Sequence, residues 1–278
     1  MGQHYVPQFY LRGFAEGNTI WVHDKVACRS FASQPKAIAN ENKIYPDDLE
    51  AHLANEIETP ANSVIHKTRN REALTEGDRL SLARYVVMLW KRVPEARSRV
   101  AARLPEVAAS VRQEIHEGLS AAAREMPDMT AVAEARKAEV DLVLDRYSQE
   151  LPPNIWQASL TKETSANVVE NFLSMNWRFL WSDRLQFLTC DNPVFFFSHE
   201  GIGSPTSELT IPLSSSVVLW ANRRPSPPAV FVTAAPAAVR EINRRTAHNA
   251  TRFVYAQRSE QWILPFVCKG AYALNRLL

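Results

Sequence analysis

The sequence predicts an α+β protein with a mixed, mostly antiparallel sheet. Helical periodicity runs through about residues 47–150, whereas short aromatic and β-branched runs between turn residues fill the chain after residue 154. One further strand is expected before the helical region, at Thr19–Val22. These three observations predict one domain over residues 1–278, in which a helical subregion (47–150) flanks a sheet made by the N-terminal strand and a sheet-rich subregion (154–278).

The chain opens with the segment MGQHYVPQFYLRGF. Pro7 excludes an uninterrupted helix here but can open a short one. Four aromatic residues in ten positions predict that the segment is buried in the core, namely Tyr5, Phe9, Tyr10 and Phe14.

Two helices are expected next. Acidic residues after Pro46 favour a helix start, and apolar residues at helical spacing extend that helix to about Lys67, with a kink or break at Thr59-Pro60. Thr75 is expected to cap the second helix, with Asp78 completing a capping box.

The stretch from Glu95 to Tyr147 is rich in Ala, Arg and Glu, which predicts two or three amphipathic helices. Breaks are expected near Pro105 and near Met126-Pro127-Asp128, because proline interrupts helical hydrogen bonding. The low aromatic content predicts a peripheral bundle.

Short strands dominate the C-terminal part. Trp177–Trp181 and Leu185–Cys190 flank a polar turn, which predicts a β-hairpin that Asp191-Asn192-Pro193 ends. Further strands are expected at Val194–Phe197, Leu209–Leu213, Ser216–Trp220 and Phe253–Ala256, and helices at Thr164–Met175 and Ala234–Ala247.

Composition narrows the class of protein. The net charge of +2 from 32 basic and 30 acidic residues lacks the strong basic excess of a nucleic-acid binder, although it leaves room for a local basic groove. Three distant cysteines without a CxxC pair argue against a thiolate zinc site and a disulfide framework, as in a reducing cytosol. The apolar runs are too short to span a bilayer and no secretory signal is visible, so a cytoplasmic protein without a membrane partner is expected.

Familiar catalytic motifs are absent from the sequence. It contains no GxGxxG, GxxxxGK[ST], GxSxG or HExxH, which excludes the simplest assignments as a Rossmann enzyme, P-loop NTPase, α/β-hydrolase or zincin. No metal-ligand motif is present either, so the cofactor is unknown, and a divalent-metal site built from distant segments stays open.

Four polar residues carry the candidate chemistry, each with a structural alternative. Asp191 follows a strand, where a carboxylate can act as a base or hold a metal, but an Asp before Asn-Pro also initiates turns. His4 is either a general base or a histidine whose hydrogen bonds hold the N-terminus. Glu56 and Arg92 lie on or beside apolar helix faces, so they form a buried pair, or Arg92 binds an anionic ligand.

The ordered motifs resemble those of the bacterial DUF4238 family, which is named for its unknown function. The resemblance covers about Gln3 to Ala256 and consists of HYVPQFYLRGF, KRVP at Lys91–Pro94, TCDNPV at Thr189–Val194, IPLS at Ile211–Ser214, and an Asn243 helix followed by RFVYA. Cys190 stands where this family often has serine, which argues against a serine nucleophile there.

The family implies no settled reaction, but its motifs hold polar residues that are far apart in the sequence, as in a cleft built from several segments. We therefore expect a site with His4, Asp191 and Asn192 as catalytic residues and Arg92, Gln8 and Asn243 as substrate-binding residues. Histidine as base, aspartate as its orienter or as a metal ligand, and arginine on an anion would suit a hydrolase of a phosphodiester or another anionic substrate, such as a nuclease acting on nucleic acid or a nucleotide. The alternative is a non-catalytic binding or protein-interaction module with buried structural polar networks. The shared site requires His4 and Asp191 to lie within about 10 Å of each other.

Overall fold

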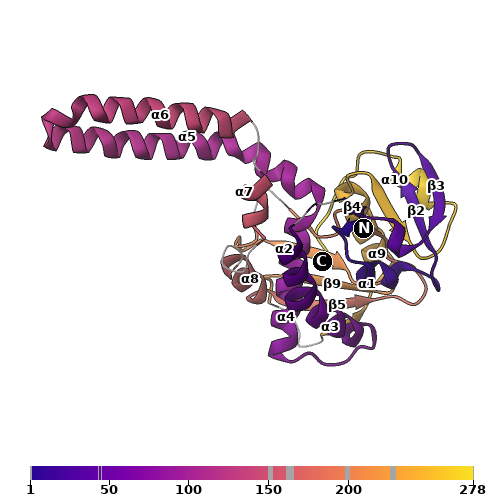
Figure 1. The fold of residues 1–278 in the computed structure, drawn as a ribbon. Coiled ribbons are helices and arrows are strands. Elements are labelled where there is room, and N and C mark those ends of the chain that lie inside the picture. Colours follow the sequence, from indigo (N-terminus) through magenta and orange to yellow (C-terminus); the bar gives the residue numbers. More distant parts are fainter. Residues whose placement is uncertain are drawn as a thin grey trace. The chain divides into compact units, whose positions relative to one another are not determined.

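The computed structural model describes residues 2–42, 44, 46–149, 153–160, 166–197, 201–225 and 230–277 (Figure 1). Contacts between Cα atoms divide the chain into two compact units. One unit joins Met1–Pro94 to Lys162–Leu278, and the other is Glu95–Thr161. The single domain over residues 1–278 stays a prediction.

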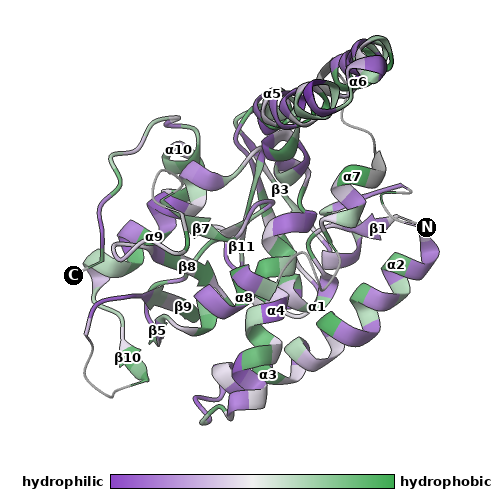
Figure 2. Cartoon of the chain, turned by 90° about the vertical axis from the view of Figure 1, so that its left-hand side faces the viewer, coloured by the Kyte–Doolittle hydropathy of each residue, from purple (hydrophilic) through white to green (hydrophobic). Residues whose placement is uncertain are grey.

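A five-stranded sheet with the order β10-β5-β9-β8-β7 lies in the first unit. Strand β10 pairs with β5 in parallel, and the other pairs are antiparallel. Every residue of β8 and β9 is buried, and Figure 2 shows green, hydrophobic segments in the region of these strands. The strands are β5 (Asn176–Trp181), β7 (Phe195–Phe196), β8 (Glu208–Pro212), β9 (Val217–Asn222) and β10 (Phe231–Thr233).

A four-stranded antiparallel sheet joins the two ends of the sequence. Its order is β3-β2-β11-β6, so the N-terminal strands pair with strands of the C-terminal part. A further pair, β1 with β4, is also antiparallel. The strands are β1 (Gln3–His4), β2 (Ile20–Asp24), β3 (Arg29–Ser33), β4 (Asn40–Glu41), β6 (Thr189–Cys190) and β11 (Phe253–Ala256).

The predicted α+β class with mostly antiparallel strands is confirmed, but the strands divide between separate sheets. The chain leaves the four-stranded sheet after Cys190 and enters the five-stranded sheet at Phe195. Pro193 lies between them, and proline has no N–H to continue a ladder. The Asp-Asn-Pro motif is therefore the crossing point between the two sheets.

The predicted hairpin of Trp177–Trp181 with Leu185–Cys190 is wrong. Strand β5 pairs along its full length with β9, while β6 pairs with β11. Two short apolar runs around a polar turn do not reveal which strand each will pair with, because that depends on segments far away in the sequence. Here β9, of the same length as β5, is the partner.

The helices predicted in the first unit are present, whereas η2 and α10 in the following set were not predicted. The set comprises α1 (Gln8–Leu11), the 3₁₀ turns η1 (Arg12–Phe14) and η2 (Pro35–Ala37), α2 (Asp47–His52), α3 (Thr59–Arg69), α4 (Glu76–Arg92), α8 (Ala166–Leu173), α9 (Pro236–Asn249) and α10 (Ile263–Val267). The expected capping box is present: Thr75 Oγ1 accepts from Asp78 N at 3.1 Å, and Asp78 Oδ2 accepts from Thr75 N at 2.9 Å. The first two residues of the helix predicted at Thr164–Met175 lie outside the described residues.

A π-helix, η3 (Leu53–Glu58), joins α2 to α3. Pro60 follows it and has no N–H to donate to the preceding turn. The hydroxyl of Thr59 instead donates to the Ala54 carbonyl at 2.9 Å. The helix predicted from Asp47 is thus present, and Thr59-Pro60 changes its winding rather than ending it.

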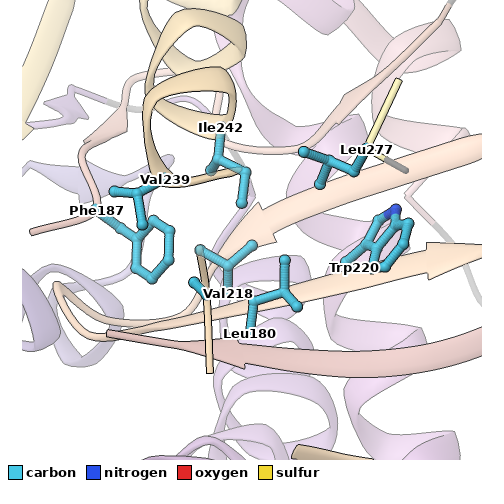
Figure 3. Close-up of a cluster of buried hydrophobic side chains, with 8 residues drawn as sticks. Leu180, Phe187, Val218, Trp220, Val239, Ile242 and Leu277 are labelled. Atoms are coloured by element: carbon cyan, nitrogen blue, oxygen red, sulfur yellow. The ribbon is translucent and has the colours of Figure 1, made fainter. Parts of the chain in front are cut away.

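Helices cover both faces of the five-stranded sheet. On one face, Leu180 and Val218 pack against Val239 and Ile242 of α9 (Figure 3). On the other face, the ring of Trp177 lies 4.6 Å from that of Phe172 in α8. The sheet is therefore the centre of a layered core.

The second unit is a pair of long helices, α5 (Pro94–Glu125) and α6 (Thr130–Gln149), linked by the 3₁₀ turn η4 (Pro127–Met129) and followed by α7 (Pro153–Ala158) (Figure 1). The break predicted near Met126 is confirmed. The break predicted near Pro105 is wrong, because α5 continues through that residue. Proline costs about 3 kcal/mol inside a helix, which a helix of 32 residues can tolerate.

Cys28 forms a disulfide with Cys268, across a Cα–Cα distance of 5.9 Å. The prediction against disulfides is wrong here: 240 residues separate the two cysteines in sequence, and only the fold brings them together. Disulfides are rare in the cytosol, so the cytoplasmic location stays a prediction. Across the described residues, no helix has the length and apolar character needed to cross a membrane.

Candidate functional site

His4 and Arg92 are brought together by the fold. Arg92 ends α4 with only 2% of its surface exposed, and its Nη2 donates to the His4 carbonyl. Its Nη1 forms an ion pair with Glu58, the last residue of the π-helix. The buried Glu–Arg pair predicted for Arg92 is therefore present, but Glu58 replaces Glu56 as the partner.

Burial changes the proton affinities in this N-terminal cluster of His4, Glu50, Glu58, Tyr85 and Arg92. It is the main cause that lowers the pKa of His4; Arg92 lowers that pKa further, while backbone hydrogen bonding at Lys36 and Pro35 opposes both. Burial also raises the pKa of Glu50, which Arg92 counteracts. A histidine with a lowered pKa is neutral at pH 7. The guanidinium of Arg92 contacts protein groups through both Nη atoms, namely the His4 carbonyl and the Glu58 carboxylate.

Asp191 lies at the crossing point between the sheets, and its carboxylate accepts three backbone hydrogen bonds. Oδ1 accepts from Thr251 N at 2.9 Å, and Oδ2 accepts from Arg252 N at 2.8 Å and from Phe253 N at 2.9 Å. Burial raises the pKa of Asp191, and these three amides oppose that rise. The carboxylate fixes the turn that leads into β11.

Asn192 holds the end of α9 against the same crossing point. Its Nδ2 donates to the Asn249 carbonyl at 3.1 Å. In the opposite direction, Asn249 Nδ2 donates to the carbonyls of Asn192 at 2.5 Å and Val194 at 3.0 Å. Asp191 and Asn192 thus form a second group, the Asp-Asn-Pro cluster.

The pKa values of His4 and Asp191 are shifted by different groups. The pKa of His4 responds to Arg92 and Glu58, whereas that of Asp191 responds to the amides of residues 251–253 and to Lys25. Tyr5 connects the two regions, since it follows His4 and its phenol is close enough to Asp191 for the carboxylate to raise its pKa. A catalytic site shared by His4 and Asp191 stays a prediction.

The two remaining predicted residues occupy other positions. Asn243 is buried in α9, where its Oδ1 accepts from Leu188 N at 2.9 Å and its Nδ2 donates to the Gln186 carbonyl at 3.1 Å. Gln8 is half-buried at the start of α1. Asn243 therefore positions the segment that leads into β6.

A cavity of about 500 Å³, here called the helical cavity, was not predicted as a site. Its walls come from α2, the π-helix, α4 and α8, and its lining comprises His52, Glu56, Ile57, Leu80, Arg84, Met88, Ala166, Val169, Glu170 and Leu173. Glu56 was noticed because it lies beside an apolar stripe, but its partner was misassigned. The other lining residues carry no sequence signal, because the cavity forms only where separate helices meet.

Metal ligation has no support in the described part of the chain, where no group of three or more His, Cys, Asp or Glu side chains could hold an ion. The cofactor stays unknown.

Replacing Asp191 by Asn is expected to lower the free energy of unfolding by about 2 kcal/mol. The amide NH₂ must face at least one of the three backbone N–H donors, so at least one hydrogen bond is lost and donors oppose each other. Chemical denaturation followed by circular dichroism would measure this. Asp183→Asn, an exposed change of the same kind, is the matched control and should stay within about 0.5 kcal/mol of the wild type. An equal stability of the two variants would contradict the role in the turn.

The comparisons with known proteins identify one family. The family model described as "Protein of unknown function (DUF4238)" matches residues 2–260 and confirms the resemblance seen in the motifs. No curated protein and no solved structure matches the chain.

Proposed function

We propose that this chain, which belongs to the DUF4238 family, is a non-catalytic small-molecule-binding protein whose ligand occupies the helical cavity. The observation that carries the proposal is that the polar residues of the family motifs and the residues that line the helical cavity are different. Arg92, Asp191, Asn192 and Asn243 each contact groups of the protein itself, while the helical cavity offers a separate space with charged residues around apolar walls.

The size and lining of the helical cavity suit a small organic ligand. Binding pockets commonly measure about 300–1,000 Å³ and have mostly apolar walls with a few polar groups. Leu80, Met88 and Val169 supply apolar surface here, and Glu56 and Glu170 are exposed carboxylates.

The charges of the lining favour a cation. Two carboxylates, Glu56 and Glu170, face one guanidinium, Arg84, so the lining is negative by one charge when His52 is neutral. The ligand class that fits is an amine with an apolar body. The phosphates of a nucleotide or nucleic acid would meet two glutamates, which disfavours that predicted partner.

Arg92 acts on this cavity through the π-helix. Its ion pair with Glu58 fixes the turn that also supplies Glu56 and Ile57 to the cavity wall. π-helical turns occur frequently at functional sites, because the extra residue redirects side chains. On this proposal the family-motif arginine positions the binding wall and does not contact ligand.

The hydrolase or nuclease activity stays a prediction and is the weaker hypothesis. A base or metal ligand must reach the substrate, whereas Asp191 is 6% exposed and its carboxylate already accepts three of the about four hydrogen bonds that it can accept.

A fluorescence titration with dansylcadaverine, an apolar fluorophore that carries a primary amine, tests the proposal. We expect saturable binding with blue-shifted emission. Met88→Trp, which fills the cavity, should weaken binding by at least about tenfold, and Glu56→Gln with Glu170→Gln by about five- to tenfold.

Glu72→Gln is the matched control, since Glu72 is an exposed carboxylate outside the lining. It should leave the affinity unchanged, and a dansyl compound with a carboxylate in place of the amine should bind more weakly. Absence of saturable binding, or unchanged affinity in a folded Met88→Trp variant, would overturn the proposal.

A further inference from the structure

A second cavity of the first unit lies on the face of the five-stranded sheet that α9 covers. We call it the C-terminal cavity; its volume is about 460 Å³, and β5, β9, β10, α9 and the segment Asn275–Leu277 contribute to its lining. Leu180, Val232 and Leu277 give it apolar walls, together with alanines of residues 234–238. It shares no lining residue with the helical cavity.

Buried donors without acceptors mark this cavity. Trp220 is 6% exposed, and its Nε1 has no hydrogen-bond partner among the described residues. The same holds for Nε of Arg178, which lies directly opposite Trp220 in the β5–β9 ladder and also lines the cavity. Leaving a buried donor unsatisfied costs about 1–3 kcal/mol, so such groups in native proteins usually meet a ligand or an ordered water.

The two side chains that carry these donors are neighbours on one face of the sheet. The guanidinium carbon of Arg178 lies 5.8 Å from the centre of the Trp220 ring. Figure 3 shows the indole nitrogen on the edge of the ring at the side where Leu277 lies. Both side chains therefore line the cavity between the sheet and the C-terminal segment, side by side.

The charges around this cavity are mainly positive. Arg178, Arg244 and Arg276 line it, and an adjoining cavity of about 250 Å³ shares Arg244 and adds Lys269. The carboxylate in the lining, Glu241, is engaged: it pairs with Arg244 at 3.1 Å and accepts from Asn275 N at 2.8 Å. Three arginines against one glutamate leave the lining of the C-terminal cavity positive by two charges.

We propose that the C-terminal cavity binds a small organic carboxylate with a flat apolar body. The carboxylate accepts hydrogen bonds from Trp220 Nε1 and from Arg178, and the body lies against Leu180, Val232 and Leu277. A neutral ligand of the same shape would leave the guanidinium without a charged partner, so the site discriminates by charge. This site is independent of the ligand proposed for the helical cavity.

Nuclear magnetic resonance of protein labelled with ¹⁵N at tryptophan tests this proposal, with the Trp220 indole resonance assigned from its loss in Trp220→Phe. Titration with naphthalene-2-carboxylate should shift the Trp220 indole N–H downfield and saturate. The neutral 2-naphthalenemethanol should bind at least about tenfold more weakly.

Arg178→Met keeps the apolar stem of the side chain and should weaken naphthalene-2-carboxylate binding by at least about tenfold. The control Arg184→Met changes an exposed arginine and should have no effect, and Met88→Trp, which fills the helical cavity, should also leave this affinity unchanged. If Arg178→Met does not fold, calorimetric titration of Trp220→Phe, which keeps an aromatic ring but loses the donor, should show weaker binding. No saturable shift, equal binding of acid and alcohol, or unaltered affinity in the folded variants would overturn the proposal and leave water as the partner of these donors.

Discussion

Replacing Arg245 by methionine is expected to lower the free energy of unfolding by about 3–5 kcal/mol. Arg245 lies in α9 with its side chain fully buried, and its Nη2 is 2.6 Å from Glu208 Oε1, which is 2% exposed. Its Nε lies 3.7 Å from Glu241 Oε1. Methionine can fill much of the space of the arginine stem, but it leaves two buried carboxylates without this cation.

Arg244→Met is the matched control for this prediction. Arg244 is the neighbouring residue and also pairs with Glu241, but its side chain is 41% exposed, so its loss should cost less than about 1 kcal/mol. Urea unfolding followed by circular dichroism would give both values. Adding Glu208→Gln to Arg245→Met should recover part of the loss, because it removes the buried carboxylate that has lost its 2.6 Å partner, whereas Glu241 keeps its pair with Arg244. Similar losses for Arg245→Met and Arg244→Met would contradict the assignment of the buried pair.

Elements with local signals could be predicted from the sequence. The capping box of α4 depends on Thr75 and Asp78, three residues apart, and β11 occupies the predicted range Phe253–Ala256. Helix α9 was likewise expected within two residues of its bounds, since Pro236 favours the first helical turn. In each case the residues that determine the element lie within it or beside it.

Pairings between distant segments could not be predicted. The partner of β5 is β9, some 40 residues later, and the partner of Cys28 is Cys268, 240 residues later. No local pattern distinguishes these partners from others of similar composition. The break predicted at Pro105 is absent for a different reason. A long helix can tolerate the free-energy cost of one proline.

In the candidate site, too, individual residues could be recognised from the sequence, but their partners could not. Asp191 at a strand exit was visible in the sequence, together with the alternative that it fixes a turn, but the amides that it accepts from lie 60 residues further on. Arg92 was expected in a buried ion pair, yet the π-helix gives it Glu58 and turns Glu56 toward the helical cavity. The sequence pattern assumed regular helical spacing, so it could not reveal that the π-helix places Glu58 beside Arg92.

Stability is also expected to fall by at most about 3 kcal/mol as the pH decreases from 6.5 to 4, because of His23. This residue of β2 is 1% exposed, and its Nδ1 lies 2.7 Å from Ser30 Oγ. Burial lowers the pKa of His23 from 6.5 to about 4. Between these two values the unfolded chain binds a proton that the folded chain does not, so each decrease in pH favours unfolding.

More than about one pH unit above 6.5 or below 4, the two states bind the same number of protons at His23, so its contribution to the pH dependence should be flat there. His23→Gln should remove most of the slope between these limits in urea unfolding measured across pH 4–8. Some slope should remain, because burial lowers the pKa of His4 in the same direction. The exposed His248, replaced in the same way, should leave the profile unchanged. If the His23→Gln protein kept the wild-type slope, His23 would not be the cause of the pH dependence. The buried imidazole would then take up its proton in the folded protein as readily as in the unfolded chain.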